Sequence, residues 1–145
     1  MSTIRDLVKD REVYIVNADD TVMAAAVYMR ERNVGAVPVL RSDALVGVFS
    51  ERDIMTRVLI EQRDPRTTKV SDVMTHDPRV VGLDELVDRC MLLMKQGGFR
   101  HLPVLDGSNH IVGFLSLRDL LLHDLDEKEV EVRMMRAYMN SSPGE

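Results

Sequence analysis

A polar motif with the pattern Ser-x-Arg-Asp occurs twice in the chain, and each copy follows an apolar run. The first copy spans residues 50–53 and the second spans residues 116–119. An aspartate carboxylate can accept hydrogen bonds from two adjacent hydroxyl groups, such as those of a ribose, and the forked donors of an arginine can neutralise a phosphate. A hydrophobic core requires no such set, so the duplication predicts a pair of binding sites.

The serine of each motif is predicted to lie at the start of a helix, where free backbone amides and the helix dipole attract phosphate. Ser50 and Ser116, with Arg52 and Arg118 two residues later, are therefore candidate phosphate contacts. The same spacing is also an ordinary capping pattern, in which the aspartate bonds to the serine amide. A single copy would be better explained as a cap, whereas two copies inside a longer repeat favour a ligand at one or both.

The motifs belong to a repeat that spans nearly the whole chain, and such a repeat fixes the architecture. Residues 46–53 return as residues 112–119, and residues 36–40 return as residues 101–105. Each half is predicted to run helix, strand, helix, strand, strand, helix. The elements are expected at residues 3–8, 12–16, 21–32, 36–40, 45–49 and from 51 in the first half, and at residues 70–74, 78–81, 84–97, 101–105, 110–115 and from 117 in the second.

Several residues in these elements carry specific expectations. Thr3 is expected to cap the first helix. Pro38 and Pro103 lack an amide donor, which places them on a sheet edge or at a bulge. Gly47 and Gly113 carry no Cβ, so a ligand or a backbone segment can come close to them.

The chain is expected to divide into three segments. Residues 1–64 form the first repeat with its N-terminal helix, residues 65–125 form the second repeat, and residues 126–145 form a helical tail that packs on a partner or on the body. The last residues, 141–145, are expected to fray. Because a half of this size usually cannot bury its own apolar face, the two halves are expected to share a core.

Composition excludes several classes of function. The net charge of -5 and pI of about 5.4 argue against binding to nucleic acid or to an anionic membrane surface. No apolar run approaches the roughly 18 residues that a spanning helix needs, and the N-terminus has no signal-peptide core. The single cysteine, Cys90, lies on a predicted inward helical stripe, suits a reducing compartment and favours a cytoplasmic protein. The four histidines lack the spacing of a metal site, so no metal is predicted.

The pattern of Gly, two apolar residues and Ser-x-x-Asp at the end of a β-α-β-β-α unit resembles the cystathionine-β-synthase (CBS) domain. Residues 34–39 (Val-Gly-Ala-Val-Pro-Val) and residues 99–104 (Phe-Arg-His-Leu-Pro-Val) strengthen the likeness, which covers about residues 3 to 125. The tandem copy resembles a CBS pair, or Bateman module. This resemblance implies an α/β fold with pseudo-twofold symmetry and two clefts for adenosine ligands such as AMP, ADP, ATP, NAD(H) or S-adenosylmethionine.

The resemblance also implies a role for particular residues. Asp53 and Asp119 would bind ribose, and the flat adenine would lie between the first strand of each repeat and the proline-containing strand. The expected adenine contacts are Ile15, Val16, Ala36, Val37, Pro38, Val80, Val81, Leu102 and Pro103. The expected phosphate contacts are Ser50, Ser116, Arg52, Arg118, Arg100 and His101.

Each phosphate chain is implied to reach toward the other repeat, so that the two clefts differ. Arg118, Arg100 and His101 would serve the site anchored by Asp53, and Arg52 would serve the other site. The first repeat has Gly-Ala where the second has Arg100 and His101, so the clefts cannot be equally basic. If only one site is occupied, we expect it to be the one at Asp53.

The sequence thus favours a non-catalytic sensor of adenine nucleotides. The resemblance adds a homodimer formed through residues 52–62 and 117–125, which the C-terminal helix could extend. An alternative is a ligand-free structural or interaction homodimer. A third is a nucleotide hydrolase that uses His101, although no residue set offers a nucleophile activated by a base.

Overall fold

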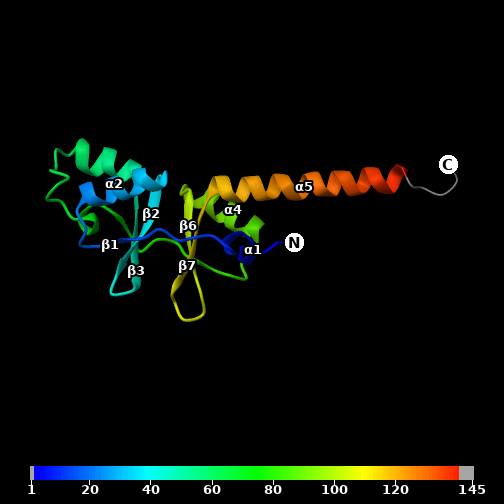
Figure 1. Cartoon of the computed structure of the whole chain (residues 1–145), viewed down its shortest axis with the longest axis horizontal. Helices are drawn as coiled ribbons and strands as arrows, with labels where there is room; N and C mark the ends of the chain where they lie inside the picture. The colour runs from blue at the N-terminus through cyan, green and yellow to red at the C-terminus, as the bar shows by residue number, and fades with distance from the viewer. Residues whose placement is uncertain (1, 141–145) are drawn as a thin grey trace.

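The computed structural model describes residues 2–140 and contains two small β-sheets, one from each half of the chain (Figure 1). The first sheet has the strand order β1-β2-β3-β4, and the second has the order β5-β6-β7. In each sheet the first strand runs parallel to the second, which forms an antiparallel hairpin with the third. The strands are β1 (Val16–Asn17), β2 (Ala36–Arg41), β3 (Ala44–Ser50), β4 (Thr75–His76), β5 (Val81–Gly82), β6 (His101–Leu105) and β7 (Ile111–Ser116).

The helices follow the same repeat, so the predicted α/β class and tandem architecture are confirmed. The first half contains α1 (Arg5–Val8), α2 (Val22–Arg32) and α3 (Glu51–Asp53), which continues into the π-helical segment η1 (Ile54–Leu59). The second half contains the 3-10 helix η2 (Val70–Asp72), α4 (Val87–Gly97) and α5 (Leu117–Asn140). The division at residues 64 and 125 stays a prediction.

The two halves do not share one core, contrary to the expectation from their size. Each half has its own cluster of buried apolar side chains, and each cluster is completed by a segment from the other half. Ile4, Leu7 and Val8 of the N-terminal region lie in the core of the second half. Val70 and Met74, in the segment that links the halves, lie in the core of the first half. The small size of each half is therefore compensated by exchange of these two segments, which we call the exchanged segments (residues 3–8 and 70–74).

Gly47 and Gly113 are positions where the chain packs closely against the sheets. A Cβ at Gly47 would lie 2.7 Å from the carbonyl oxygen of Thr75 and would also meet the sulfur of Met74. A Cβ at Gly113 would overlap the side chain of Val8. The close approach that the sequence predicted at both glycines is thus made by the chain itself.

Some local details differ from the sequence-based expectations. Thr3 does not cap α1 but forms a β-bridge with Leu86, and the helix begins after Ile4 without a side-chain cap. The expected strands at residues 12–16 and 78–81 shorten to β1 and β5, two residues each. Residues before them leave the sheets because the chain must cross from an exchanged segment of one half to the sheet of the other.

The prolines lie beside irregularities, as predicted. Pro38 pairs with Val48 of β3, and the register of this hairpin shifts between Val39 and Leu40. The parallel partner β1 pairs only from Val39 onward, so no donor is required at Pro38. The matching shift in the second sheet follows Pro103, between Val104 and Leu105.

The last helix, α5, continues without a break through the boundary expected at residue 125 and extends well beyond the body (Figure 1). Every residue from Lys128 to Asn140 is exposed, so this part of the predicted tail does not pack on the body. The expected fraying falls on residues 141–145, which lie outside the described residues. Among the helices in residues 2–140, none combines the length and the apolar character needed to cross a membrane.

Candidate functional site

Both Ser-x-x-Asp motifs form complete capping boxes where a strand passes into a helix. The Ser50 amide donates to Asp53 Oδ2 at 2.9 Å, and the Asp53 amide donates to Ser50 Oγ at 3.3 Å. The same two bonds join Ser116 and Asp119 at 2.9 and 3.1 Å. The capping interpretation is therefore confirmed for both copies, and any ligand must use what the caps leave available.

Each cap engages only the Oδ2 atom of its aspartate, and the Oδ1 atom faces an arginine. Asp53 Oδ1 lies 3.8 Å from Nε of Arg57, and Asp119 Oδ1 lies 3.1 Å from Nη1 of Arg11. Asp53 is buried, whereas the side chain of Asp119 is 27% exposed. Each motif thus keeps one carboxylate oxygen next to a guanidinium group. The carboxylate oxygen can accept a hydrogen bond from a hydroxyl group, and the guanidinium group can bind a phosphate.

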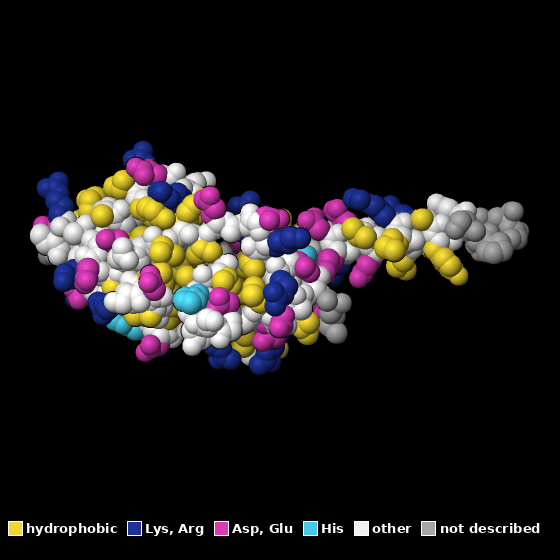
Figure 2. All heavy atoms as spheres, turned by 60° about the horizontal axis from the view of Figure 1, so that its bottom comes forward, with side chains coloured by type: hydrophobic (Ala, Val, Ile, Leu, Met, Phe, Trp, Pro, Cys, Tyr) yellow, Lys and Arg dark blue, Asp and Glu magenta, His cyan; other side chains and the backbone are white. Residues whose placement is uncertain are grey.

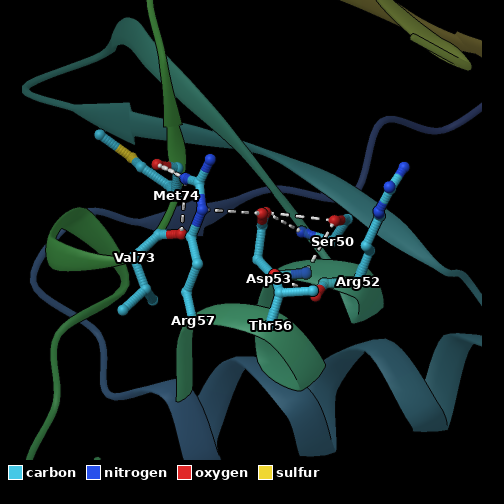
Figure 3. A network of polar contacts seen from close by, with 7 residues as sticks. All are labelled: Ser50, Arg52, Asp53, Thr56, Arg57, Val73 and Met74. Atoms are coloured by element: carbon cyan, nitrogen blue, oxygen red, sulfur yellow. Dashed lines mark hydrogen bonds and ion pairs between the residues drawn. The ribbon is translucent and has the colours of Figure 1, made fainter. Parts of the chain in front are cut away.

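Arg57 connects the first motif to an exchanged segment (Figure 3). Its Nη1 donates to the carbonyl oxygens of Val73 at 3.2 Å and Met74 at 2.8 Å. Arg57 was not among the site residues predicted from the sequence, although its spacing of four residues from Asp53 on a helix was an available signal. Arg52, which was predicted as a phosphate contact, instead extends away from the Asp53 carboxylate in Figure 3.

Arg11, which was not predicted from the sequence either, connects the second motif to the chain just after the other exchanged segment. It lies between α1 and β1, and no local pattern relates it to Asp119, because the two meet only when α1 packs on the second half. Burial raises the pKa of Asp119, but the hydrogen bonds from Ser116 and from Arg11 outweigh burial and hold this pKa below its usual value.

The first amides of both capped helices are already bonded within the chain, contrary to the expectation of free amides there. Besides the amides in the capping boxes, Glu51 donates to the Gly35 carbonyl at 2.9 Å and Leu117 donates to the Arg100 carbonyl at 2.8 Å. A phosphate at either helix start would therefore rely on side chains, or would have to displace these bonds. The phosphate role of the two serines stays a prediction.

His101 lies within electrostatic reach of residues from both halves. It begins β6, and its ring stacks on Phe114 with a centroid distance of 5.2 Å and an interplanar angle of 9°. Burial lowers the pKa of His101, and Arg100 adds to that effect, while the carboxylates of Asp119 and Glu51 oppose it. A largely neutral imidazole at this junction is better suited to stacking and hydrogen bonding than to charge neutralisation of a phosphate.

Most of the predicted adenine contacts are buried in the two sheets. Ile15 and Val80 are the exceptions, with exposed fractions of 36% and 38%. They occupy matching positions just before β1 and β5, so each half presents one exposed aliphatic side chain beside its proline-containing strand. The buried members of the set are Val16, Ala36, Val37, Pro38, Val81, Leu102 and Pro103.

Two hollows lie away from the predicted residues. A groove of about 1030 Å³ runs between α4 and α5, where Met91, Leu92 and His123 are among the lining residues. A smaller hollow of about 500 Å³ lies beside β5 and the β6–β7 turn, next to Arg5 and Asp84. Neither hollow was predicted from the sequence, because both form between elements far apart in the chain.

Cys90 is a core residue, as its position on the helical stripe predicted. It is fully buried, and burial, with a smaller contribution from Glu85, raises its thiol pKa to about 11. Within residues 2–140, no group of three or more His, Cys, Asp or Glu side chains is placed to hold a metal ion.

Comparison with known proteins places the chain among proteins of one family. The model described as "CBS domain" matches twice, at residues 4–60 and 70–126. The chain is 32% identical to CBSX3 of Arabidopsis thaliana, a mitochondrial CBS domain-containing protein, over 83% of this chain and 61% of that protein's length. It is also 32% identical to the CBS domain-containing protein YhcV of Bacillus subtilis, over 88% of this chain and 89% of that protein.

Solved structures give the same likeness. A protein with CBS domains from Burkholderia ambifaria superposes with a TM-score of 0.78 at 34% identity, covering 83% of this chain and 91% of that chain. CBSX2 of Arabidopsis thaliana, solved in complex with AMP, superposes with a TM-score of 0.74 at 26% identity, covering 87% of this chain and 98% of that chain.

Proposed function

The chain belongs to the CBS domain family, and from that premise we propose that it is a non-catalytic regulatory module that binds an adenine nucleotide between its repeats. The ligand would be AMP, ADP, ATP or an NAD(H)-type dinucleotide. Binding would favour one relative orientation of the two halves, and a partner protein would respond to that orientation.

The observation that carries the proposal is the pairing of a spare carboxylate oxygen with an arginine in both repeats. The Oδ1 atoms of Asp53 and Asp119 can accept from ribose hydroxyls while their Oδ2 atoms keep the caps intact. The guanidinium groups of Arg57 and Arg11, which lie beside these aspartates, could bind the phosphate groups of the ligand. The AMP complex of CBSX2, a relative with 26% identity, supports the same class of ligand.

The exchanged segments supply a route from ligand binding to orientation. Arg57 joins Asp53 to the carbonyls of Val73 and Met74, and Arg11, which pairs with Asp119, lies three residues after α1. A ligand that draws either arginine toward its phosphate would loosen one attachment between a capped helix and an exchanged segment. The two halves would then be free to settle in a different relative position.

A thermal-shift panel with AMP, ADP, ATP, NAD, NADH and S-adenosylmethionine tests the proposal. A specific ligand at about 100 times its dissociation constant should add roughly 2.7 kcal/mol to the unfolding free energy. For a chain of this size the midpoint should rise on the order of 10 °C. No shift with any adenosine compound would contradict nucleotide binding.

Substitutions of the two aspartates separate the sites. We expect Asp53→Ala to abolish more of the ligand-induced shift than Asp119→Ala, because the basic residues predicted for the Asp53 site are more numerous. Each substitution also removes a cap and lowers the baseline midpoint, at a cost of about 1 kcal/mol. The increment caused by ligand is therefore the quantity to compare, and Asp126→Ala, at an exposed position on α5, is the matched control.

The ligand-free alternative has one specific observation in its favour, since both capping boxes are complete without any ligand. In that case the surface between copies would be the function. Binding of nucleotide with full affinity by a variant that lacks both aspartates would show that the site lies elsewhere. Turnover of nucleotide that His101→Ala abolishes would contradict the non-catalytic proposal.

We also propose that the module forms a homodimer through its second helices and acts in the cytoplasm. Exposed apolar side chains lie on η1, at the residue just after it and on the first turns of α5, and such side chains favour association. They are Met55, Leu59, Ile60, Leu121, Leu122 and Leu125. Light scattering after size exclusion should report at least twice the chain mass, and Leu59→Asp should reduce it.

A further inference from the structure

The outer part of α5 projects from the body, and its first turn, with Lys128, Val130 and Glu131, borders the groove between α4 and α5. All residues from Lys128 to Asn140 are exposed, and these thirteen residues span about 20 Å of helix. Figure 2 shows hydrophobic side chains along this segment, between basic and acidic ones. A helical segment that projects from the body gains no stability from tertiary packing unless a partner covers its apolar face.

The apolar residues of the segment lie on two faces of the helix, with Val130, Met134 and Tyr138 on one face and Val132, Met135 and Met139 on the other. The second set forms a narrow stripe. Val132, Met135 and Met139 are exposed and follow each other at intervals of three and four residues. Lys128 precedes them by four, so the stripe has the a/d spacing of a coiled coil, with Lys128 and Met135 at d and Val132 and Met139 at a. At about 100° per residue, this face is rotated by roughly a quarter of a turn from Leu120, the residue that α5 buries in the core.

We propose that this stripe pairs with the same stripe of a second copy of the chain, in antiparallel orientation. Val132 would face Met135 of the second copy, and Lys128 would face Met139 of the second copy. Residues 127–140 of the two helices would overlap, which is nearly the length that is exposed. The two bodies would lie at opposite ends of the helix pair.

The charges beside the stripe select this arrangement. In an antiparallel pair the e positions of the two helices face each other, so Glu129 would meet Arg136 of the second copy on both sides of the symmetry axis. Within residues 2–140, Arg136 takes part in no ion pair. Lys128 is already bound to Asp124 at 2.9 Å, so its stem can cover a methionine while its charge stays paired.

Other arrangements place like charges together. In a parallel pair, Lys128 would face Lys128 of the second copy in the core between the two helices. Asp124 would then lie next to Glu129 of the second copy. An antiparallel pair shifted by one heptad would bring Glu129 and Glu131 each against the same residue of the second copy. Directly opposed like charges disfavour both alternatives.

This contact is separate from the proposed dimer surface on η1 and the first turns of α5, and it does not depend on nucleotide binding. It is tested by sedimentation equilibrium of the full chain. We expect Arg136→Glu to weaken self-association about tenfold, because two attractive contacts become repulsive. We expect the charge exchange Glu129→Arg with Arg136→Glu to restore it.

The control is a second charge exchange, Glu131→Arg with Arg136→Glu, which would restore a parallel pair only. Restoration by this control instead of by the Glu129 exchange would overturn the antiparallel assignment. Unchanged association in Arg136→Glu, or a wild-type chain that is monomeric, would overturn the pairing altogether. Because Arg136→Glu leaves both Ser-x-x-Asp motifs intact, its nucleotide-induced thermal shift reports on the proposed function independently.

Discussion

Asp53 and Asp119 make the same cap in the same fold position, yet they are held by arginines of different origin. Arg57 comes from the same helix as its aspartate, and Arg11 comes from the chain that crosses between the halves. The residue that corresponds to Arg57 in the repeat is His123, whose Nε2 lies 3.3 Å from Oε1 of Glu127 and not beside Asp119. The two predicted sites therefore differ in a second way besides Arg100 and His101, because their aspartates have different arginine partners.

Stability should depend on pH through Asp119. Its pKa in the folded chain is below its usual value of 3.8, so the unfolded chain binds more protons as the pH falls toward this range. The stabilisation by Asp119 is thus complete above its unfolded pKa and is lost as the pH falls through the folded pKa. Urea unfolding between pH 7 and pH 3 should show a smaller loss of stability in Asp119→Asn than in the wild type.

Removing the arginine partner provides the control for this pH dependence. Arg11→Ala should also reduce the loss of unfolding free energy between pH 7 and pH 3, as Asp119→Asn does, because Arg11 lowers the pKa of the Asp119 carboxyl. If Arg11→Ala left this pH dependence of the unfolding free energy unchanged, the ion pair between Arg11 and Asp119 would not contribute to it.

Cys90 should be unreactive in the native protein. Its burial and a pKa of about 11 leave almost no thiolate at pH 8. A thiol reagent should therefore modify the folded chain slowly and the urea-unfolded chain at once, as absorbance measures. Equal rates in both states would contradict the buried position.

At the level of elements, the sequence patterns predicted the hairpins, the long helices and the capped helix starts. The two-residue turn of the β2–β3 hairpin, with Ser42 and Asp43 at φ of 51° and 64°, follows from local turn chemistry. The exchange of segments could not be predicted, because Leu7 and Val73 would present the same apolar pattern to either half. For the same reason the contact between Arg11 and Asp119 left no trace in the local sequence.

Gly113→Ala tests the packing of an exchanged segment. The added methyl group would overlap Val8, and overpacking of this kind costs about 1–3 kcal/mol. Guanidinium unfolding should show this loss, whereas Gly82→Ala, where an added Cβ meets nothing within 4 Å, should be nearly neutral. In combination with Val8→Ala, the cost of Gly113→Ala should shrink, and strict additivity of the two would contradict the contact.

At the scale of the whole molecule, the repeat predicted two similar halves, and the structure adds a long helix that breaks their symmetry. The first half ends its second helix at Leu59, whereas the corresponding helix of the second half continues to Asn140. The charged and apolar residues of the tail predicted a helix there. These residues could not show that the helix projects from the body, because its direction is set by the position and direction of the end of β7, where α5 begins.

Deletion of residues 1–8 should destabilise the second half first. The deletion removes Ile4, Leu7 and Val8 from that core, and each is worth about 1.5–3 kcal/mol of burial. Hydrogen exchange should then lose protection in β6, β7 and α4 while β2 and β3 retain more of theirs. Deletion of residues 128–145 is the control and should leave the exchange of the body unchanged, and equal loss in both halves would contradict separate cores.

The exchange of the short helices has a consequence for how such a chain can arise. A single repeat expressed alone would carry a short helix that completes the core of another repeat, and its own core would lack the matching helix. It would be complete only as a swapped pair of chains. Joining two repeats by the segment between residues 61 and 69 makes both insertions intramolecular, so that the chain closes upon itself at an effective concentration in the millimolar range rather than at that of the cell.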